Sequence, residues 1–498
     1  MNYCSLLFDT KDEYLDREAV IDGESGRRIT YRGLKEEVLR VAAFLKGKGY
    51  KPGTIISMHL YNSAEAAVVL LAVEYIGCVI CLIDPLFKPG ELNYYVKDSD
   101  SKCLITYLKK EDVPLEDGLE VDIINVSEIE EACRMPLADY SLVEEYYNFE
   151  EDDLAMLIYT SGSTSTPKGV MLTTGCFFTF LRKNRESKYP YNPDDRLLCF
   201  VPFSHAYGCV SLFAPSMEGK AAIVFLRSFQ PVRIAKVIDD EKITHIFGVP
   251  THYQQLLRYE AFYVQLRKLK KAFCAAAPLN YDTALSWYKN IGIYLDEGLG
   301  LCEATTLITS RRDMLPEPAG NVGFPAKSVL TVEVADQQGQ ICEDGIIGEI
   351  RVKGPGLMLG YYKRPEETAE RLRDGYLYTG DLGYRRSDGS FVLCGRKTEF
   401  INVAGLKISP IEIEAVLNSH PDVVDSAVIG IEDSLYGEVV KAFVVLKEDR
   451  NMQERDLIRY TSEKLANLKV PKSITFLAEF PRNNIGKIDK KALKNIKS

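Results

Sequence analysis

The chain has 498 residues, 46% hydrophobic and 27% charged, which excludes intrinsic disorder and allows two or more domains with sizeable cores. Its formal net charge is -10. This charge disfavours a general nucleic-acid or anionic-membrane binder, because both classes use clustered basic surfaces.

Neither a membrane span nor an export signal is expected. The longest apolar region, residues 66–83, is interrupted by Glu74 and ends at Asp84, so it is too short to cross a bilayer. The first nine residues lack the basic and apolar parts of an export signal. The twelve cysteines lie in apolar segments, which favours reduced thiols, and Cys78 and Cys81 have no second pair that would favour a metal site. We therefore expect a cytoplasmic protein.

Segments of strand length alternate with helical patterns in the first half of the chain. We expect strands at 54–60, 79–83, 221–226 and 244–249, and helices at 64–75 and 231–240. This alternation predicts parallel sheets flanked by helices. After about residue 320 the expected strands are shorter, as at 332–338 and 348–353, and a turn lies at 388–389. This change of pattern predicts a small barrel-like subdomain.

A separate C-terminal unit is expected to begin near Gly395 and Arg396. Its predicted elements are a helix at 410–417, strands at 423–429 and 439–446, and a helix around 452–465. We therefore predict an α/β fold class, with a large N-terminal domain at 1–395 and a small α+β C-terminal domain at 396–498.

Residues 159–170 point most directly to a function, because hydroxyls, glycines and a lysine follow the apolar residues 154–158. Gly162 and Gly169 permit close backbone approach, while Lys168 supplies positive charge and the hydroxyls can donate to phosphate oxygens. A solvated Ser/Thr loop is the alternative. The loop of P-loop NTPases is disfavoured, since Lys168 lies six residues after Gly162 and precedes a glycine. We predict a phosphate-binding loop.

Further motifs follow this loop in order. They lie at residues 202–208, 276–279, 298–303, 348–350, 360–362, 378–381, 395–396, 405–414 and 484–488. With these motifs, nearly the whole chain resembles the adenylate-forming superfamily of acyl- and aryl-CoA synthetases, carrier-loading adenylation domains and luciferases, and it is most similar to AMP-forming acyl-CoA synthetases. The resemblance implies that a carboxylate attacks the α-phosphate of ATP, giving an acyl-adenylate and pyrophosphate, before the acyl group passes to a phosphopantetheine thiol.

The resemblance also implies a catalytic set. Lys487 matches the family's catalytic lysine, whose ammonium would stabilise two mutually repelling anions in the transition state. Glu303 matches the glutamate that holds Mg2+, a cation that prefers hard oxygen donors. Thr164 belongs to the phosphate loop and His205 to the acid site. Each of these residues has an alternative interpretation. Lys487 could be a solvated lysine, Glu303 a surface carboxylate and His205 a packed core histidine.

The implied nucleotide site contains Asp381 and Arg396. Asp381 matches the ribose-binding aspartate, whose two acceptor oxygens suit a vicinal diol, although residues 378–381 could also form a type II turn. Arg396 would contact ribose and phosphate, or form an interdomain salt bridge. The other residues that the resemblance places at ATP are Thr160, Ser161, Gly162, Ser163, Thr164, Lys168, Ala276, Ala277, Pro278, Gly298, Leu299, Gly300 and Cys302.

Three positions depart from the family pattern. Leu299 replaces the aromatic residue that stacks on adenine, and Cys302 replaces a hydroxyl with a weak S–H donor. Ser165 replaces a common glycine of the phosphate loop. These departures leave open a catalytically impaired nucleotide-binding protein of the same fold.

The expected acid pocket is apolar and mostly uncharged. Its predicted wall consists of Phe203, His205, Tyr207, Phe247, Gly248, Val249 and Ala275. Residues 204–206 stand where activators of α-amino acids usually place an aspartate, so an aliphatic or aromatic acid is expected instead. We expect CoA as the acceptor, and a carrier protein stays open because it presents the same pantetheine arm.

Family members rotate the C-terminal domain between the two half-reactions, so the resemblance predicts a mobile lid that carries Lys487. The hinge is expected at 396–399, where Thr398 stands in place of the more usual Asp or Lys. Gly405 and Leu406 are expected at the pantetheine tunnel, where a side chain at 405 would obstruct passage. A simple turn glycine is the alternative for Gly405.

Overall fold

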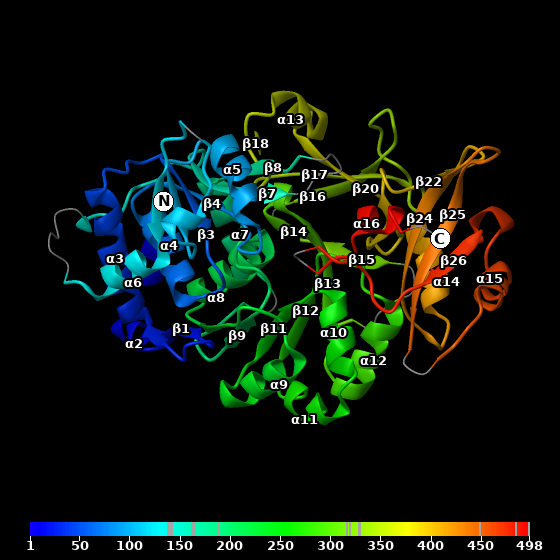
Figure 1. Ribbon diagram of the computed structural model, residues 1–498, viewed down its shortest axis with the longest axis horizontal. Helices are drawn as coiled ribbons and strands as arrows, with labels where there is room; N and C mark the ends of the chain where they lie inside the picture. The colour runs from blue at the N-terminus through cyan, green and yellow to red at the C-terminus, as the bar shows by residue number, and fades with distance from the viewer. Residues whose placement is uncertain are drawn as a thin grey trace.

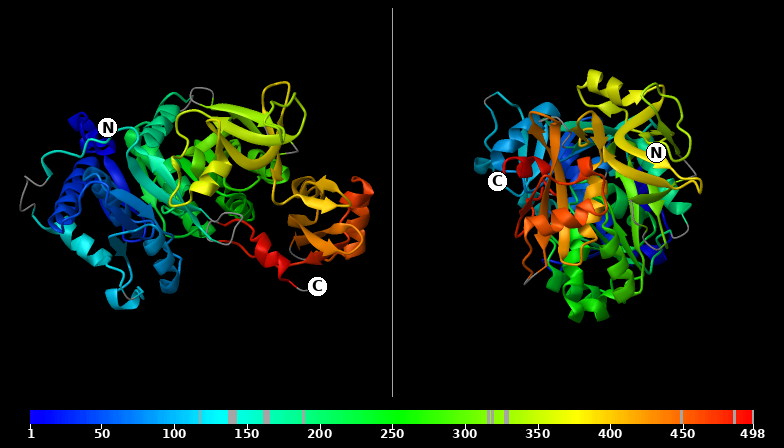
Figure 2. Two further views of the ribbon diagram at one scale, coloured as in Figure 1. Left: turned by 90° about the horizontal axis from the view of Figure 1, so that it is seen from above. Right: turned by 90° about the vertical axis from the view of Figure 1, so that its right-hand side faces the viewer.

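The computed structural model describes residues 1–498 except 117, 137–142, 161–165, 188–189, 315–316, 318–319, 327–329, 448–449, 484–485 and 497–498. Figure 1 shows a large part that contains the N-terminus and a smaller part near the C-terminus. In Figure 2 the smaller part, drawn in orange, lies at one end of the molecule, and the last helix, drawn in red, lies between it and the larger part.

The first part of the chain forms a seven-stranded, mainly parallel sheet. Its strands are β3 (Ile55–His59), β4 (Val79–Leu82), β5 (Cys103–Thr106), β6 (Asp122–Asn125), β7 (Leu154–Thr160), β8 (Lys168–Thr173) and β18 (Gly360–Tyr361). The helices of this part of the chain are α1 (Tyr3–Phe8), α2 (Asp12–Leu15), α3 (Tyr31–Gly47), α4 (Ala64–Tyr75), α5 (Pro89–Asp98), η1 (Lys110–Asp112), α6 (Val126–Arg134) and α7 (Thr174–Arg185).

The strand order of this sheet is β18-β8-β7-β4-β3-β5-β6, and the strands from β7 to β6 are parallel. Helix α4 begins after Ser63, whose side chain accepts a hydrogen bond from the N–H of Ala66, and nearly all of its residues are buried. A helix that is apolar all round fits this position inside the core. The predicted strands at 54–60 and 79–83 and the helix at 64–75 are confirmed.

A fourteen-stranded sheet runs through the rest of the larger part. Its strands are β1 (Glu18–Asp22), β2 (Arg28–Thr30), β9 (Arg196–Cys199), β10 (Ala222–Phe225), β11 (His245–Gly248), β12 (Lys271–Cys274), β13 (Leu295–Leu301), β14 (Thr306–Arg311), β15 (Asn321–Pro325), β16 (Thr331–Ala335), β17 (Gly348–Lys353), β19 (Leu372–Arg373), β20 (Tyr376–Arg385) and β21 (Phe391–Arg396). The helices are η3 (Tyr207–Phe213), α8 (Ala214–Glu218), α9 (Pro231–Asp240), α10 (Pro250–Leu257), η4 (Glu260–Phe262), α11 (Tyr263–Leu266), α12 (Tyr281–Ile291), η5 (Cys302–Ala304) and α13 (Pro365–Arg371).

This sheet changes from parallel to antiparallel along its length. Its order is β16-β17-β20-β21-β15-β14-β13-β12-β11-β9-β10-β1-β2, with β19 paired to β20. Strands β1, β10, β9, β11, β12 and β13 pair in parallel, whereas every pairing from β13 to β16 is antiparallel. The predicted strands at 221–226 and 244–249, the helix at 231–240 and the short strands after 320 are confirmed.

The C-terminal unit has its own sheet and core. Its elements are β22 (Ile401–Val403), β23 (Leu406–Ile408), α14 (Pro410–Asn418), β24 (Val423–Asp433), β25 (Gly437–Leu446), α15 (Glu454–Ser462), η6 (Asn467–Lys469), β26 (Ser473–Phe476) and α16 (Lys490–Lys494). The sheet order is β23-β22-β25-β24, with β26 paired to β25. Ile413, Leu417, Val428, Val444 and Leu457 belong to a buried cluster separate from the larger core. The predicted helix at 410–417 and strands at 423–429 and 439–446 are confirmed.

Within the described ranges, no helix has both the length and the hydropathy needed to cross a membrane. All twelve cysteines are free thiols, and ten of them are buried. Among the described residues no group of three or more His, Cys, Asp or Glu is placed to hold a metal ion, so Cys78 and Cys81 do not form such a cluster.

Candidate active site

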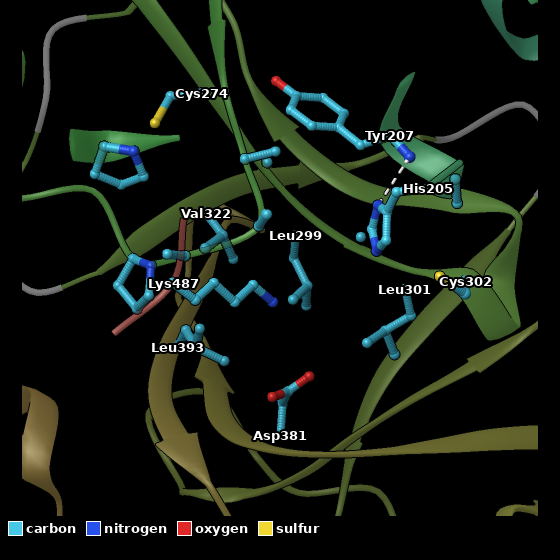
Figure 3. Close-up of a pocket in the computed structure, with 18 of the residues that line it drawn as sticks. His205, Tyr207, Cys274, Leu299, Leu301, Cys302, Val322, Asp381, Leu393 and Lys487 are labelled. Atoms are coloured by element: carbon cyan, nitrogen blue, oxygen red, sulfur yellow. Dashed lines mark hydrogen bonds between the residues drawn. The ribbon is translucent and has the colours of Figure 1, made fainter. Parts of the chain in front are cut away.

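A cavity of about 2030 Å³ lies where the larger part meets the C-terminal unit. Residues that follow β11, β12 and β13 line it, at the carboxyl ends of parallel strands where open α/β sheets bind ligands. Residues 486–491 of the C-terminal unit also line it. Figure 3 shows how side chains from both parts converge on this cavity.

Lys487 enters the cavity from a tight turn of the C-terminal unit. Its N–H donates to the Asn483 side-chain oxygen at 2.9 Å, and Gly486 before it has a φ of +80°. In Figure 3 the side chain runs into the cavity between Leu299 and Asp381. Burial and the neighbouring Arg396 charge lower the pKa of Lys487. The structure therefore holds the Lys487 amine at a half-buried place where an anion would stabilise its charged form.

Asp381 and Arg396 form an ion pair across β20 and β21. Arg396 Nε lies 2.7 Å from Asp381 Oδ1, and the two residues are register partners in the sheet. The second carboxylate oxygen, Oδ2, is buried and has no hydrogen-bond partner in the described part of the chain. Burial raises the pKa of Asp381 to about 6, an effect that Arg396 and Lys487 oppose. The free acceptor oxygen is suited to a hydroxyl donor from a ligand.

Glu303 lies in η5, at the point where the large sheet changes from parallel to antiparallel. Its Oε1 accepts a hydrogen bond of 2.8 Å from the Tyr361 hydroxyl. Glu303 lines the cavity, and its carboxylate is a donor that suits Mg2+.

Thr160 and Lys168 lie near the two ends of the predicted phosphate loop and line the cavity. Lys168 forms an ion pair with Glu367 of α13, and its Nζ lies 5.3 Å from the centre of the Tyr361 ring. The loop residues Ser161, Gly162, Ser163, Thr164 and Ser165 lie outside the described residues. The assignment of this loop to phosphate therefore stays a prediction.

His205 and Tyr207 line the part of the cavity that we associate with the acid. His205 Nδ1 accepts a hydrogen bond of 3.2 Å from the N–H of Tyr207, so the proton of the neutral ring is on Nε2. Burial, with the nearby Lys487 charge, lowers the pKa of His205 to about 4, which leaves the imidazole neutral at physiological pH. The Tyr207 hydroxyl donates to the Phe273 carbonyl at 3.2 Å.

Three residues predicted to line the acid pocket lie behind its wall instead. Phe203 is 1% exposed and packs edge to face against Phe213 and Phe225 in the core. Gly248 and Val249 are likewise absent from the residues that line the cavity. This corrects the prediction for all three. Phe203 lies in the irregular segment after β9, where side-chain direction follows no strand period, and Gly248 and Val249 lie at the end of β11, where the chain leaves the sheet.

Most other predicted site residues reach the cavity. The residues that line it include Phe247, Ala275, Ala276, Ala277, Pro278, Gly298, Leu299, Gly300, Cys302 and Thr398. Gly405 and Leu406 do not, because they lie at the exposed turn between β22 and β23. The predicted tunnel residues are therefore apart from the other site residues in this arrangement.

Tyr361 and Arg371 also line the cavity, although no motif predicts a role for either residue by itself. Tyr361 holds Glu303, and Arg371 donates to the Tyr378 carbonyl at 3.1 Å while its charge favours the ionised form of Asp381. The motif at 360–362 indicates that Tyr361 lies near the site. Arg371 had no signal, because it ends a short, partly exposed helix.

Comparisons with known proteins point to one family. The AMP-binding enzyme family model matches residues 7–362, and the AMP-binding enzyme C-terminal domain model matches residues 412–487. A long-chain-fatty-acid–CoA ligase of Bacillus subtilis is 30% identical, over 98% of this chain and 93% of its own length. A feruloyl-CoA synthase of Amycolatopsis sp. is 32% identical, over 93% of each chain.

Solved structures give the same result. The ATP-bound crystal structure of MatB from Rhodopseudomonas palustris is 28% identical and matches 99% of this chain and 98% of its own, with a TM-score of 0.91. The TM-score with the apo crystal structure of MatB is 0.82 at the same coverage. Sequence and fold together show that this chain belongs to the AMP-binding enzyme family.

Proposed function

We propose that this protein is an AMP-forming acid–thiol ligase, which activates a carboxylic acid with ATP and transfers the acyl group to CoA. The observation that carries this proposal is the placement of Lys487. It comes from the C-terminal unit yet lies in the cavity with Asp381, Arg396 and Glu303 of the larger part. Relatives that match more than nine-tenths of the chain are named as CoA ligases or synthases.

The proposed chemistry brings a carboxylate and the α-phosphate of ATP together. The Lys487 ammonium would touch both anions and neutralise charge that peaks in the transition state. Asp381 would accept hydrogen bonds from the ribose hydroxyls through its free oxygen. Glu303 would hold Mg2+, which supplies positive charge to the phosphates when bound. Neutral His205 would donate from Nε2 into the acid site.

For the acid, we propose an aliphatic or aromatic carboxylic acid rather than an α-amino acid. His205, Tyr207 and Phe247 offer no carboxylate for a substrate ammonium. The names of the relatives cover a long-chain fatty acid, coumarate, ferulate and sulfoacetate, so they support no single acid for this chain. A carrier-protein acceptor is the second candidate, because it presents the same thiol arm as CoA.

We also propose a reducing compartment such as the cytoplasm, supported by the twelve free cysteines. A catalytically impaired nucleotide binder is a further candidate function. It is favoured by Leu299 and Cys302, which remove the ring for adenine and the hydroxyl before Glu303.

A screen of carboxylic acids for AMP release tests the proposal, run without acceptor, with CoA and with a pantetheinylated carrier protein. We expect acid-dependent release with Mg2+ and a faster rate with CoA. Faster AMP release with the carrier protein than with CoA would identify the carrier protein as the acceptor. Nucleotide binding without release for any acid would support the impaired protein.

The role of Lys487 is tested by Lys487→Ala in acid-dependent ATP–pyrophosphate exchange. We expect a loss on the order of 100- to 1,000-fold, because the variant removes the charge that stabilises the transition state. Lys494→Ala is the matched control, since Lys494 is exposed in the same tail and does not line the cavity. Exchange that survives in Lys487→Ala at the control rate would remove the lysine from the mechanism.

A further inference from the structure

Lys183 is a buried lysine that the proposed chemistry does not use. It lies in the last turn of α7 and lines the cavity, and the residue is 8% exposed. Its Nζ is itself buried and has no hydrogen-bond partner in the described part of the chain. Burial lowers the pKa of Lys183 to about 8, so the ammonium form is still substantially populated at neutral pH.

An unpartnered ammonium inside a protein is costly, because it has lost water and gained no hydrogen bond. Ser187 stands four residues later, lines the same cavity and has a buried Oγ without a partner. Ser187 lies just after the end of α7 at Arg185, so both groups reach the cavity from the C-terminal end of this helix. Two unsatisfied donors at a cavity are the arrangement expected where a ligand supplies the acceptor.

Lys183 lies away from the reaction centre. The titratable group that acts on it electrostatically is Cys176, two turns earlier in α7, whereas Lys487 and Asp381 act on each other. Helix α7 packs against α8, which continues directly from η3, the helix that begins at Tyr207. Ser211 of η3 lines the cavity together with His205 and Tyr207, and Phe180 and Lys183 of α7 line the same cavity.

We propose that Lys183, with Ser187, binds a second anionic group at the distal end of the acid, so that the preferred substrate class is a carboxylic acid with a further carboxylate or similar anion. This inference rests on the proposed function and narrows its substrate. Lys487 would meet the reacting carboxylate and Lys183 the distal anion. An acid without the distal group would leave the Lys183 ammonium unpaired, which selects against it.

Two matched series of acids test the proposal, straight-chain monocarboxylic acids and α,ω-dicarboxylic acids of the same carbon numbers. AMP release is measured for wild type, Lys183→Met and Arg182→Met. Methionine keeps the volume of the buried chain, while Arg182 is exposed on the neighbouring position of α7 and is the control. We expect wild type and Arg182→Met to prefer the dicarboxylates. Lys183→Met should lose on the order of 100-fold in kcat/KM for them and gain for the monocarboxylates.

Binding without turnover is a second measurement. Dicarboxylates with AMP should raise the thermal midpoint of wild type and Arg182→Met but not of Lys183→Met, whose own midpoint without ligand should not fall. If wild type activates monocarboxylates and Lys183→Met has the same preference between the two series, the role of Lys183 is wrong. The proposed function would still stand in that case. Failure of every acid in both measurements would remove the proposed function, and this inference with it.

Discussion

Asp381 is a buried carboxylate that is only partly satisfied by its neighbours. It is 2% exposed, one oxygen pairs with Arg396, and the other has no partner in the described structure. Burial raises its pKa to about 6. A carboxylate kept in this state is explained by a ligand that donates two hydrogen bonds to it, which is what a ribose diol does.

We predict that adenosine binding weakens as the pH falls through about 6, because protonation of Asp381 replaces an acceptor with an O–H donor. Adenosine is the probe since it has the diol but no phosphate that titrates in the same range. The measurement is calorimetric affinity at several pH values. Asp381→Asn should bind more weakly and show no midpoint near pH 6. A flat wild-type profile would contradict the role of Asp381.

Single residues also show which parts of the site can be predicted from the sequence. Motifs predicted that Lys487, Glu303, Asp381 and Arg396 belong together, and the structure places all four at one cavity. Motifs cannot describe residues outside their pattern. Lys183 sits in an ordinary amphipathic helix, and its burial depends on what packs around α7, which no local spacing reports.

Helices and strands are predicted best where an apolar segment is bounded by residues that end the element. Helix α9 matches its prediction because Pro231 starts it and the chain turns polar after Asp240. Strand β24 extends to Asp433, beyond the predicted 429, because its pairing with β25 continues to Gly437 through polar residues. The π-helix η3 was not predicted, since its i to i+5 pattern leaves no periodic signature in an apolar stretch.

The β22–β23 hairpin carries a prediction at the scale of an element. Ala404 and Gly405 form its turn with φ values of +50° and +83°, and nothing lies within 4 Å of a Cβ placed at Gly405. Space alone therefore does not require glycine in this arrangement. The positive φ favours glycine, and a further requirement would come from the second half-reaction, when the hairpin faces the pantetheine arm.

We predict that Gly405→Leu keeps adenylate formation and loses thioester formation, because the side chain would block the thiol path only after the C-terminal unit rotates. Pyrophosphate exchange and CoA thioester yield are measured separately. Gly389→Leu is the control for backbone strain, since Gly389 also has a positive φ, +86°, in an open turn. Equal loss of both half-reactions in Gly405→Leu would assign the glycine to folding instead.

At the scale of the whole molecule, two parts with separate cores meet at the cavity. Lys397 Nζ lies 3.0 Å from Glu349 Oε2 of the larger part, and Lys397 is half exposed. A Cβ at Gly486 would lie 3.1 Å from Val249 Cγ2. The boundary at residue 396 and the rotation of the C-terminal unit stay predictions. A substitution at Gly486, which lies against Val249 of the larger part, can test the rotation.

We predict that Gly486→Ala slows adenylate formation by on the order of 100-fold, because the methyl group meets Val249 and the positive φ disfavours alanine, which shifts Lys487 from its place. Thioester formation from a synthetic acyl-adenylate should be spared, since that step does not use the docked turn. Both rates are measured by single-turnover kinetics. Gly389→Ala, with a similar φ and no close neighbour, is the control, and an equal effect in both variants would refute the docking role.

The distribution of thiols has a practical consequence. Every cysteine precedes Arg396, so the C-terminal unit has none. Ten are buried, and burial raises the pKa of the partly exposed Cys342 and Cys394, which makes both slow toward maleimides. One cysteine introduced on the surface of each part would therefore accept spin labels selectively. Pulsed electron paramagnetic resonance could then measure how far the two parts separate during turnover, without first stripping the native thiols.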